Sequence, residues 1–253
     1  MLVASAPLEV FDEIDSTILE ARRRADGGDV GPVWLVARRQ TAGRGRRGRV
    51  WASIEGNLFA TYLGRLSAPP AEIALLGFAT GLAIAEACDA VIGPGRARLK
   101  WPNDVFIEGA KASGLMLDSG ALGDGAYWVA IGFGVNLVDA PEGLDQPTTA
   151  LRAHLPPDAP APDPIAFFNI VRPRLEHWAD QLARDGFAPL RRAWLARAHG
   201  LGAEARVVLG QSEISGKLAG LSESGELEFD TAEGRRLIAA GDVLFPPSST
   251  QSF

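Results

Sequence analysis

The sequence predicts an α+β protein with a mixed, mostly antiparallel sheet, packed helices and a small β-barrel or sandwich near its C-terminal end. First, 47% of the 253 residues are apolar, which is enough to bury a sizeable core. Second, the strand-like runs between residues 98 and 135 are joined by short connections, which favour antiparallel hairpins over βαβ crossovers. Third, after residue 203 the chain changes to short alternating runs with tight turns, which is typical of a small β-barrel.

Helices are predicted in four places by length and residue type. Residues 9–26 begin as a short strand and continue as a helix, for which Asp15, Ser16 and Thr17 are the candidate N-caps. The segment 71–87 is apolar nearly all round, which predicts burial in the core. The remaining helices are expected at 165–184 and 189–199.

The other strands are predicted by apolar and β-branched runs that are bounded by turn residues. They are expected at 33–37, 57–63, 98–100, 105–107, 112–118 and 127–135. Residues 139–164 hold seven prolines and predict a long loop. The change of texture places a domain boundary near 200–202, so we expect one domain over 1–202 and a smaller one over 203–253.

Charge and composition argue against several broad classes of protein. The net charge of -6 argues against binding of nucleic acid by the whole surface. Residues 1–17 lack a basic region and contain acidic residues where a signal peptide is apolar, and the uncharged apolar stretch 73–85 is too short to span a bilayer. The single cysteine, Cys88, excludes an internal disulfide and fits a reducing compartment. We therefore expect a cytoplasmic protein that does not bind membranes.

Lysine is rare in this chain, which has 22 arginines but only Lys100, Lys111 and Lys217 as lysines. A compact ammonium acts as a point charge where a planar guanidinium does not fit. A lysine that persists in this background is either placed by chance or does what arginine cannot. The three histidines and the single cysteine lack metal-ligand spacing, so no metal site made of protein groups alone is predicted.

The glycine- and arginine-rich segment 40–51 matches nucleotide-binding patterns only in part. Gly43, Gly45 and Gly48 fit G-x-G-x-x-G, but the residues after them do not look helical, and no acidic residue follows at the required spacing. The later motifs of a protein kinase and the G-K-[ST] of a P-loop are also missing. Two interpretations stay open: a solvated basic loop that could contact nucleic acid, and a flexible loop whose guanidinium groups bring two anions together.

Three later segments could bind a polar ligand, and each has an ordinary structural alternative. In K-W-P-N-D-V, Asn103 and Asp104 suit either a hairpin turn or a ligand contact. Lys111 begins an apolar strand, either as an edge residue that discourages aggregation or as a cation aimed into a site. Gly132 and Gly134 lie two apart on one strand face, which marks either the close approach of a ligand or a local bulge.

Taken together, these segments resemble the biotin protein ligase family. In order along the chain they are Asp15-Ser-Thr17, QTAGRGRRGRVW at 40–51, KWPNDV at 100–105, the Lys111-x-x-Gly114 strand and IGFGVNL at 131–137. The motifs at 40–51 and 100–105 are quite specific, and the resemblance covers residues 9–140, with a weaker family element at 148–151. It implies a catalytic domain like that of class II aminoacyl-tRNA synthetases, followed by an SH3-like β-barrel.

The resemblance also implies a role for each matching residue. The biotin pocket would contain Ser16, Thr17, Ile18, Gln40, Arg44, Gly45, Arg46 and Lys111. The nucleotide would contact Arg46, Arg49, Trp51, Asn103, Asp104 and Asn136. Lys111 and Arg44 would be catalytic, and Mg²⁺ would be held through the nucleotide phosphates, with Asp104 as the candidate protein contact. Ile18 departs from the family pattern, which usually has Asn there, so a side-chain hydrogen bond to biotin from this position would be missing.

The implied activity is ATP-dependent activation of biotin to biotinyl-5′-AMP, then transfer of biotin to a lysine of a carrier domain of acetyl-CoA carboxylase or another biotin carboxylase. A DNA-binding role is not expected, since only fifteen residues precede Ser16. Whether the enzyme forms a homodimer is left open. The alternatives are a lipoate or octanoate protein ligase, an arginine-loop nucleic-acid-binding module and a non-catalytic biotin sensor.

Overall fold

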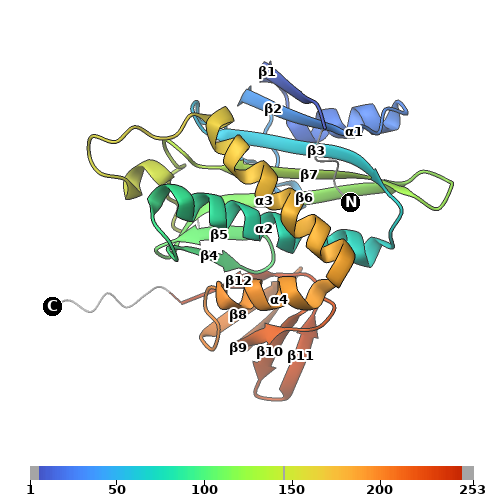
Figure 1. The fold of residues 1–253 in the computed structure, drawn as a ribbon. Coiled ribbons are helices and arrows are strands. Elements are labelled where there is room, and N and C mark those ends of the chain that lie inside the picture. Colours follow the sequence, from blue (N-terminus) through green and yellow to red (C-terminus); the bar gives the residue numbers. More distant parts are fainter. Residues whose placement is uncertain (1–5, 145, 247–253) are drawn as a thin grey trace.

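The fold is seen in a computed structural model that describes residues 6–144 and 146–246. Its larger sheet contains β1 (Leu8–Ile14), β2 (Val33–Gln40), β3 (Leu58–Leu66), β4 (Ala97–Lys100), β5 (Asp104–Ile107), β6 (Ala110–Ala121) and β7 (Tyr127–Val135). The strand order is β1-β2-β3-β7-β6-β5-β4, and every neighbouring pair is antiparallel except β1 and β2 (Figure 1). The predicted mixed, mostly antiparallel sheet is therefore confirmed.

Helices cover both faces of this sheet. They are α1 (Thr17–Asp26), α2 (Pro70–Ile92), α3 (Pro164–Asp185) and α4 (Phe187–Ala196), with 3₁₀ turns η1 (Arg46–Gly48) and η2 (Leu151–His154). Side chains of β2 alternate between the two faces, as the two-residue period of a strand requires. Trp34 and Val36 join the main core with α2 and α3, whereas Val33 and Leu35 pack with α1 on the other face.

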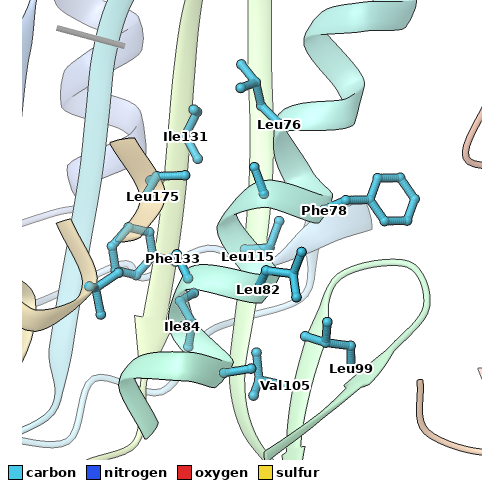
Figure 2. Packing of buried hydrophobic residues seen from close by; sticks show 14 of the residues in the cluster. Leu76, Phe78, Leu82, Ile84, Leu99, Val105, Leu115, Ile131, Phe133 and Leu175 are labelled. Carbon is cyan, nitrogen blue, oxygen red and sulfur yellow. The ribbon is translucent and has the colours of Figure 1, made fainter. Parts of the chain in front are cut away.

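The main core lies between the sheet and the pair α2 and α3. Figure 2 shows Leu82 and Ile84 of α2 close to side chains of the sheet, with Leu175 of α3 beside them. Helix α2 has 23 residues and is long and apolar enough to cross a membrane, but 78% of its apolar window is buried inside the fold. The expected core helix is thus present, and its apolar surface is covered by the protein itself.

A second sheet follows α4 and lies below the first in Figure 1. It contains β8 (Glu204–Leu209), β9 (Ser212–Leu221), β10 (Leu227–Thr231), β11 (Gly234–Ile238) and β12 (Asp242–Leu244), in the order β11-β10-β9-β8-β12. The buried apolar side chains of this sheet belong to the same cluster as α2 and the larger sheet. Trp101 Nε1 also donates to the Gly225 carbonyl at 3.3 Å, so the two sheets share a core.

The expected elements occur, but some bounds differ. Helix α2 extends beyond 71–87 in both directions, while α4 ends at Ala196 rather than at His199. Ser16 is the N-cap of α1, although its side chain makes no capping hydrogen bond. The proline-rich loop of 139–164 contains η2, which the sequence pattern did not predict.

Candidate active site

A cavity of about 450 Å³ opens on the α1 face of the larger sheet. The adjacent strands β3, β7 and β6 form its floor through Phe59, Thr61, Gly132, Gly134, Gly114 and Met116. The N-terminal end of α1 and the end of β2 supply one side, and residues 44–52 supply another. The site therefore lies where a loop, a helix N-terminus and a sheet meet.

One end of the cavity is lined by small polar groups held in a fixed arrangement. Gln40 Oε1 accepts hydrogen bonds from the Thr17 amide at 2.8 Å and from Thr17 Oγ1 at 3.2 Å. Thr61 Oγ1 donates to Thr17 Oγ1 at 2.9 Å. The buried Ser16 hydroxyl, by contrast, has no hydrogen-bond partner within the described part of the chain. Because a buried hydroxyl is costly to leave unpaired, Ser16 is suited to bind a polar ligand atom.

The glycines of β6 and β7 make room for two side chains above the sheet. A Cβ on Gly134 would lie 2.5 Å from the Trp51 ring, and one on Gly114 would lie 2.9 Å from it. A Cβ on Gly132 would lie 3.1 Å from Ile18 Cδ1. Close approach is therefore the reason for glycine at 132 and 134, and the approaching groups are Ile18 and Trp51. Ile18 is buried with α1 and gives the cavity an apolar wall at this point.

The arginine-rich segment forms a tight loop at the cavity rim. Gly45 and Arg49 are joined by a backbone hydrogen bond of 2.8 Å, and Arg47 adopts the left-handed conformation with φ 55°. Arg46 Nη1 donates to Asn103 Oδ1 at 2.8 Å, which ties the loop to the β4–β5 turn. Arg46 is half-buried, and burial lowers the pKa of its guanidinium. Arg44 is exposed beside the cavity, which it lines.

Two further arginines of this loop reach the second sheet. Arg47 Nη1 lies 3.1 Å from Asp242 Oδ2, and Arg49 Nη2 contacts both carboxylate oxygens at 3.1 and 3.2 Å. Asp242 begins β12, so the C-terminal sheet holds the loop at the cavity rim. Nothing in the sequence pattern could have shown this contact, because the partners are more than 190 residues apart.

Lys111 supplies a further cation to the cavity, next to Trp51. Its ammonium lies 2.6 Å from Asp104 Oδ1 and 5.6 Å from the centre of the Trp51 ring. Asp104 Oδ1 is buried and has no other hydrogen-bond partner among the residues described, so this ion pair is its compensation. Lys100 is also buried, and its Nζ donates to Gln146 Oε1 at 3.0 Å. Burial lowers the pKa of the Lys100 ammonium.

The structure brings nearly all the sequence-predicted residues together. The cavity is lined by Ser16, Thr17, Ile18, Gln40, Arg44, Gly45, Arg46, Arg49, Trp51, Asn103, Lys111 and Asn136. Asp104 does not line it, but its carboxylate pairs with Lys111, which does. Sequence reasoning missed Phe59 and Thr61, although the alternation along β3 could have placed them on one face. It also missed Gln146, which lies in the proline-rich loop.

No cluster of three or more His, Cys, Asp or Glu side chains that could hold a metal ion occurs in residues 6–144 and 146–246. Among the described residues, Asp104 is the carboxylate that pairs with Lys111, and the ammonium already neutralises it. A divalent ion here would therefore take most of its ligands from a bound substrate and water, which is the usual way in which Mg²⁺ accompanies a nucleotide.

The fold and the cavity define a ligand-binding α+β protein in which a small polar pocket adjoins a cationic wall. A model of the biotin/lipoate A/B protein ligase family matches residues 13–136. The biotin–[acetyl-CoA-carboxylase] ligase of Paracoccus denitrificans is 39% identical over 234 residues, which cover 91% of this chain and 97% of that protein. The Mycobacterium tuberculosis ligase of the same name is 32% identical, with coverage of 94% and 88%.

A solved structure extends the likeness to three dimensions. The biotin protein ligase from Aquifex aeolicus in complex with biotin and ATP superposes with a TM-score of 0.77 at 30% identity, covering 94% of this chain and 97% of that chain. This chain belongs to the biotin protein ligase family.

Proposed function

We propose that this protein uses ATP to activate biotin as biotinyl-5′-AMP and then transfers the biotin to a lysine of a biotin carboxyl carrier domain. The observation that carries the proposal is a single cavity in which the polar pocket at Ser16 adjoins a cationic wall. This wall consists of Lys111 and the arginines of residues 44–50, which we call the arginine loop. Biotin has a polar ureido ring at one end and a carboxylate at the other. Such a cavity can bind both ends and present the carboxylate to a phosphate.

The small polar groups are the proposed ureido site. The unpaired Ser16 hydroxyl would bond the ring, while Thr17 and Gln40 are held in place by their mutual hydrogen bonds. Ile18 offers apolar contact, so we propose that any polar contact at this position comes from the backbone. Arg44, Gly45 and Arg46 would cover the biotin chain and its carboxylate from the rim.

The nucleotide is assigned to the far side of the loop. Arg49 would bind phosphate, Trp51 would pack on the adenine, and Asn103 and Asn136 would contact the nucleotide from the sheet side. Asp104 would hold Mg²⁺ together with phosphate oxygens and water, and the ion would neutralise phosphate charge when bound. The fit rests on the Asp104 carboxylate, whose buried Oδ1 has no hydrogen-bond partner among the described residues and lies beside Lys111.

The chemistry needs two anions within reach of each other. A biotin carboxylate oxygen attacks the α-phosphorus of ATP, and the bond to pyrophosphate breaks. Lys111, which can face both the carboxylate and the α-phosphate, and Arg44 would position the reactants and neutralise their charge. The arginine loop would exclude water from the mixed anhydride. In the second step a neutral lysine amine attacks the biotinyl carbonyl carbon, and AMP leaves.

The carrier partner follows from the relatives, which are named for biotinylation of acetyl-CoA carboxylase. We propose in addition that the protein is cytoplasmic and that it has no DNA-binding role. The net charge of -6 supports the second of these proposals. Dimer formation is left to measurement. A lipoate or octanoate ligase is not favoured, and the arginine loop is engaged with Asn103 and Asp242 rather than spread as a nucleic-acid surface.

The proposal is tested by pyrophosphate release with biotin and ATP, with and without a carrier domain. We expect pyrophosphate to be released when biotin is present, and not when lipoate or octanoate replaces it. Lys111→Arg and Arg44→Ala should lower the rate by a factor on the order of 100 or more, as expected when a charge-stabilising group is lost. Normal activation by both variants would show that the catalytic assignment is wrong, and release that does not depend on biotin would refute the function.

A further inference from the structure

A short segment of the proline-rich loop, Pro147–Thr149, completes the sheet at the point where Lys111 lies. The register of β6 and β7 ends at the pair Ser113 and Val135, and one further bond joins Asn136 N to the Ala112 carbonyl at 2.8 Å. Beyond that end the segment takes the place of β7. Lys111 N donates to the Pro147 carbonyl at 2.8 Å, and Thr149 N donates to the Lys111 carbonyl at 2.9 Å. Both backbone groups of Lys111 are therefore fixed by this segment.

The same segment holds Asn136, the proposed nucleotide contact at the end of β7. Asn136 Nδ2 donates to the Thr149 carbonyl at 3.1 Å, and the Leu151 amide donates to the Asn136 carbonyl at 3.0 Å. Thr149 thus lies between the residue proposed to bind the biotin carboxylate and a residue proposed to bind the nucleotide. A shift of its backbone would move both.

His154, at the end of η2, fixes the Thr149 side chain. His154 Nε2 lies 2.8 Å from Thr149 Oγ1, and its Nδ1 lies 3.2 Å from Arg96 Nη2. A guanidinium can only donate, so Nδ1 must accept, and the ring proton of a neutral imidazole then lies on Nε2. Nε2–H consequently donates to Thr149 Oγ1. The side chain of His154 is only 9% exposed, and burial lowers its pKa, so the neutral form is favoured.

Arg96 anchors the imidazole to the body of the protein. Its Nη1 donates to the Ile92 carbonyl at the end of α2 and to the His154 carbonyl, at 2.9 and 3.1 Å, and it pairs with Glu108. Glu108 Oε2 is 3.5 Å from His154 Nδ1, which is too long for a good hydrogen bond. Neither His154 nor Thr149 lines the cavity, so both can act only through the residues that they hold.

We propose that His154 and Thr149 are positioning residues that hold Lys111 and Asn136 in the geometry required for biotin activation. The inference rests on the proposed function for the roles of Lys111 and Asn136. Small displacements of catalytic groups are enough to slow a reaction strongly, because the reacting atoms must be held in near-attack geometry.

The test compares Thr149→Val, which removes the hydroxyl at nearly constant volume, with Thr149→Ser, which keeps it. His154→Ala is compared in the same way with His154→Gln, which keeps an N–H donor at the end of the side chain. Thr80→Val is the matched control, since it also removes a threonine hydroxyl inside the fold, one that donates to the Leu76 carbonyl within α2 and not to this segment.

We expect Thr149→Val and His154→Ala to lower kcat/KM for biotin-dependent pyrophosphate release on the order of 10-fold. Thr149→Ser and His154→Gln should recover most of it, and Thr80→Val should change thermal stability alone. A second readout is independent of activity: hydrogen exchange at Lys111 and Thr149 should become faster in the two disabling variants only.

Two results would overturn the proposal. One is kinetics and exchange in Thr149→Val that match those of Thr80→Val. The other is a Thr149→Ser variant as impaired as Thr149→Val, since the hydroxyl would then not be the cause. If the unmodified protein released no pyrophosphate with biotin, the proposed function would fail, and the exchange measurement would still decide whether His154 and Thr149 fix Lys111.

Discussion

At the scale of single residues, the cavity depends on a strand position that has no side chain. Gly134 has no Cβ, and the Trp51 ring occupies that space against the strand. The ring in turn lies beside the Lys111 ammonium at 5.6 Å, where the negative face of an aromatic ring attracts a cation. One glycine thus sets the place of both an aromatic and a charged group of the proposed site.

Gly134→Ala should therefore displace Trp51 from its place on β7. We expect KM for ATP in pyrophosphate release to rise on the order of 10-fold, while KM for biotin changes less. The reason is that Trp51 is proposed to contact the nucleotide and not biotin. Gly77→Ala in α2 is the control, since its Cβ would meet Leu117 and Leu115 at ordinary contact distances of 3.5 and 3.7 Å. An unchanged KM for ATP in Gly134→Ala would remove Trp51 from the nucleotide site.

The buried histidines predict how stability depends on pH. Burial lowers the pKa of His154 and of His199 from an ordinary value of 6.5. Below that value the unfolded chain takes up protons that the folded protein does not yet bind, so the free energy of unfolding falls as pH decreases through this range. Urea unfolding between pH 7.5 and pH 5.5 should show this fall, with a smaller slope in His154→Gln. Equal slopes in both proteins would argue against the lowered pKa of His154.

At the scale of elements, the arginine loop is held by contacts that a substrate could replace. Arg47 and Arg49 are paired with Asp242, and both pairs are partly exposed to solvent. Such pairs contribute little stability, but they limit where the loop can lie. Phosphate offers the same guanidinium groups a doubly charged partner, so the loop can exchange the carboxylate for a nucleotide.

Asp242→Asn should loosen the loop with little effect on the fold. We expect a stability change below about 1 kcal/mol, together with faster hydrogen exchange over residues 44–50. Asp230→Asn is the control, because Asp230 pairs with Arg235 in the same small sheet and not with the loop. If loop exchange in the two variants were equal, the Asp242 contacts would not restrain the loop.

At the scale of the whole molecule, the two sheets share one buried cluster. Phe229 of β10 and Leu82 of α2 are both fully buried members of it, and Trp101 bonds across the boundary to Gly225. The expected division at 200–202 stays a prediction. A continuous core favours unfolding of both sheets together, since neither can lose its partner without exposing apolar surface.

Phe229→Ala should for this reason destabilise the entire protein. We expect a loss of roughly 3–5 kcal/mol and a single, shifted transition in calorimetry. Leu237→Ala in the neighbouring strand is the control, because Leu237 is 56% exposed and a surface change costs within about 0.5 kcal/mol. Two separate transitions, with only one of them shifted by Phe229→Ala, would show that the sheets unfold independently.

The sequence alone determined the local features of this protein. Alternating and helical periods depend on neighbours along the chain, so the strands, the buried α2 and the change to a small β unit were predictable. The motifs at 40–51 and 100–105 likewise predicted one part of the cavity lining, because each motif is contiguous: Gln40, Arg44, Gly45, Arg46, Arg49, Trp51 and Asn103. The end of α4 was predicted too late, at the residue before Gly200, because the backbone of residues 197–199 pairs with Leu99 instead of continuing the helix.

Only the tertiary structure decided which distant residues meet. Asp242 reaches the arginine loop, Thr61 joins the Ser16 pocket, and Pro147–Thr149 fixes Lys111, each through contacts between segments far apart in sequence. No local pattern encodes such contacts, because they follow from strand order and from where each strand ends. The residues proposed to bind the substrates could therefore be predicted from the sequence. The contacts that hold these residues in place were set by the packing of the whole chain.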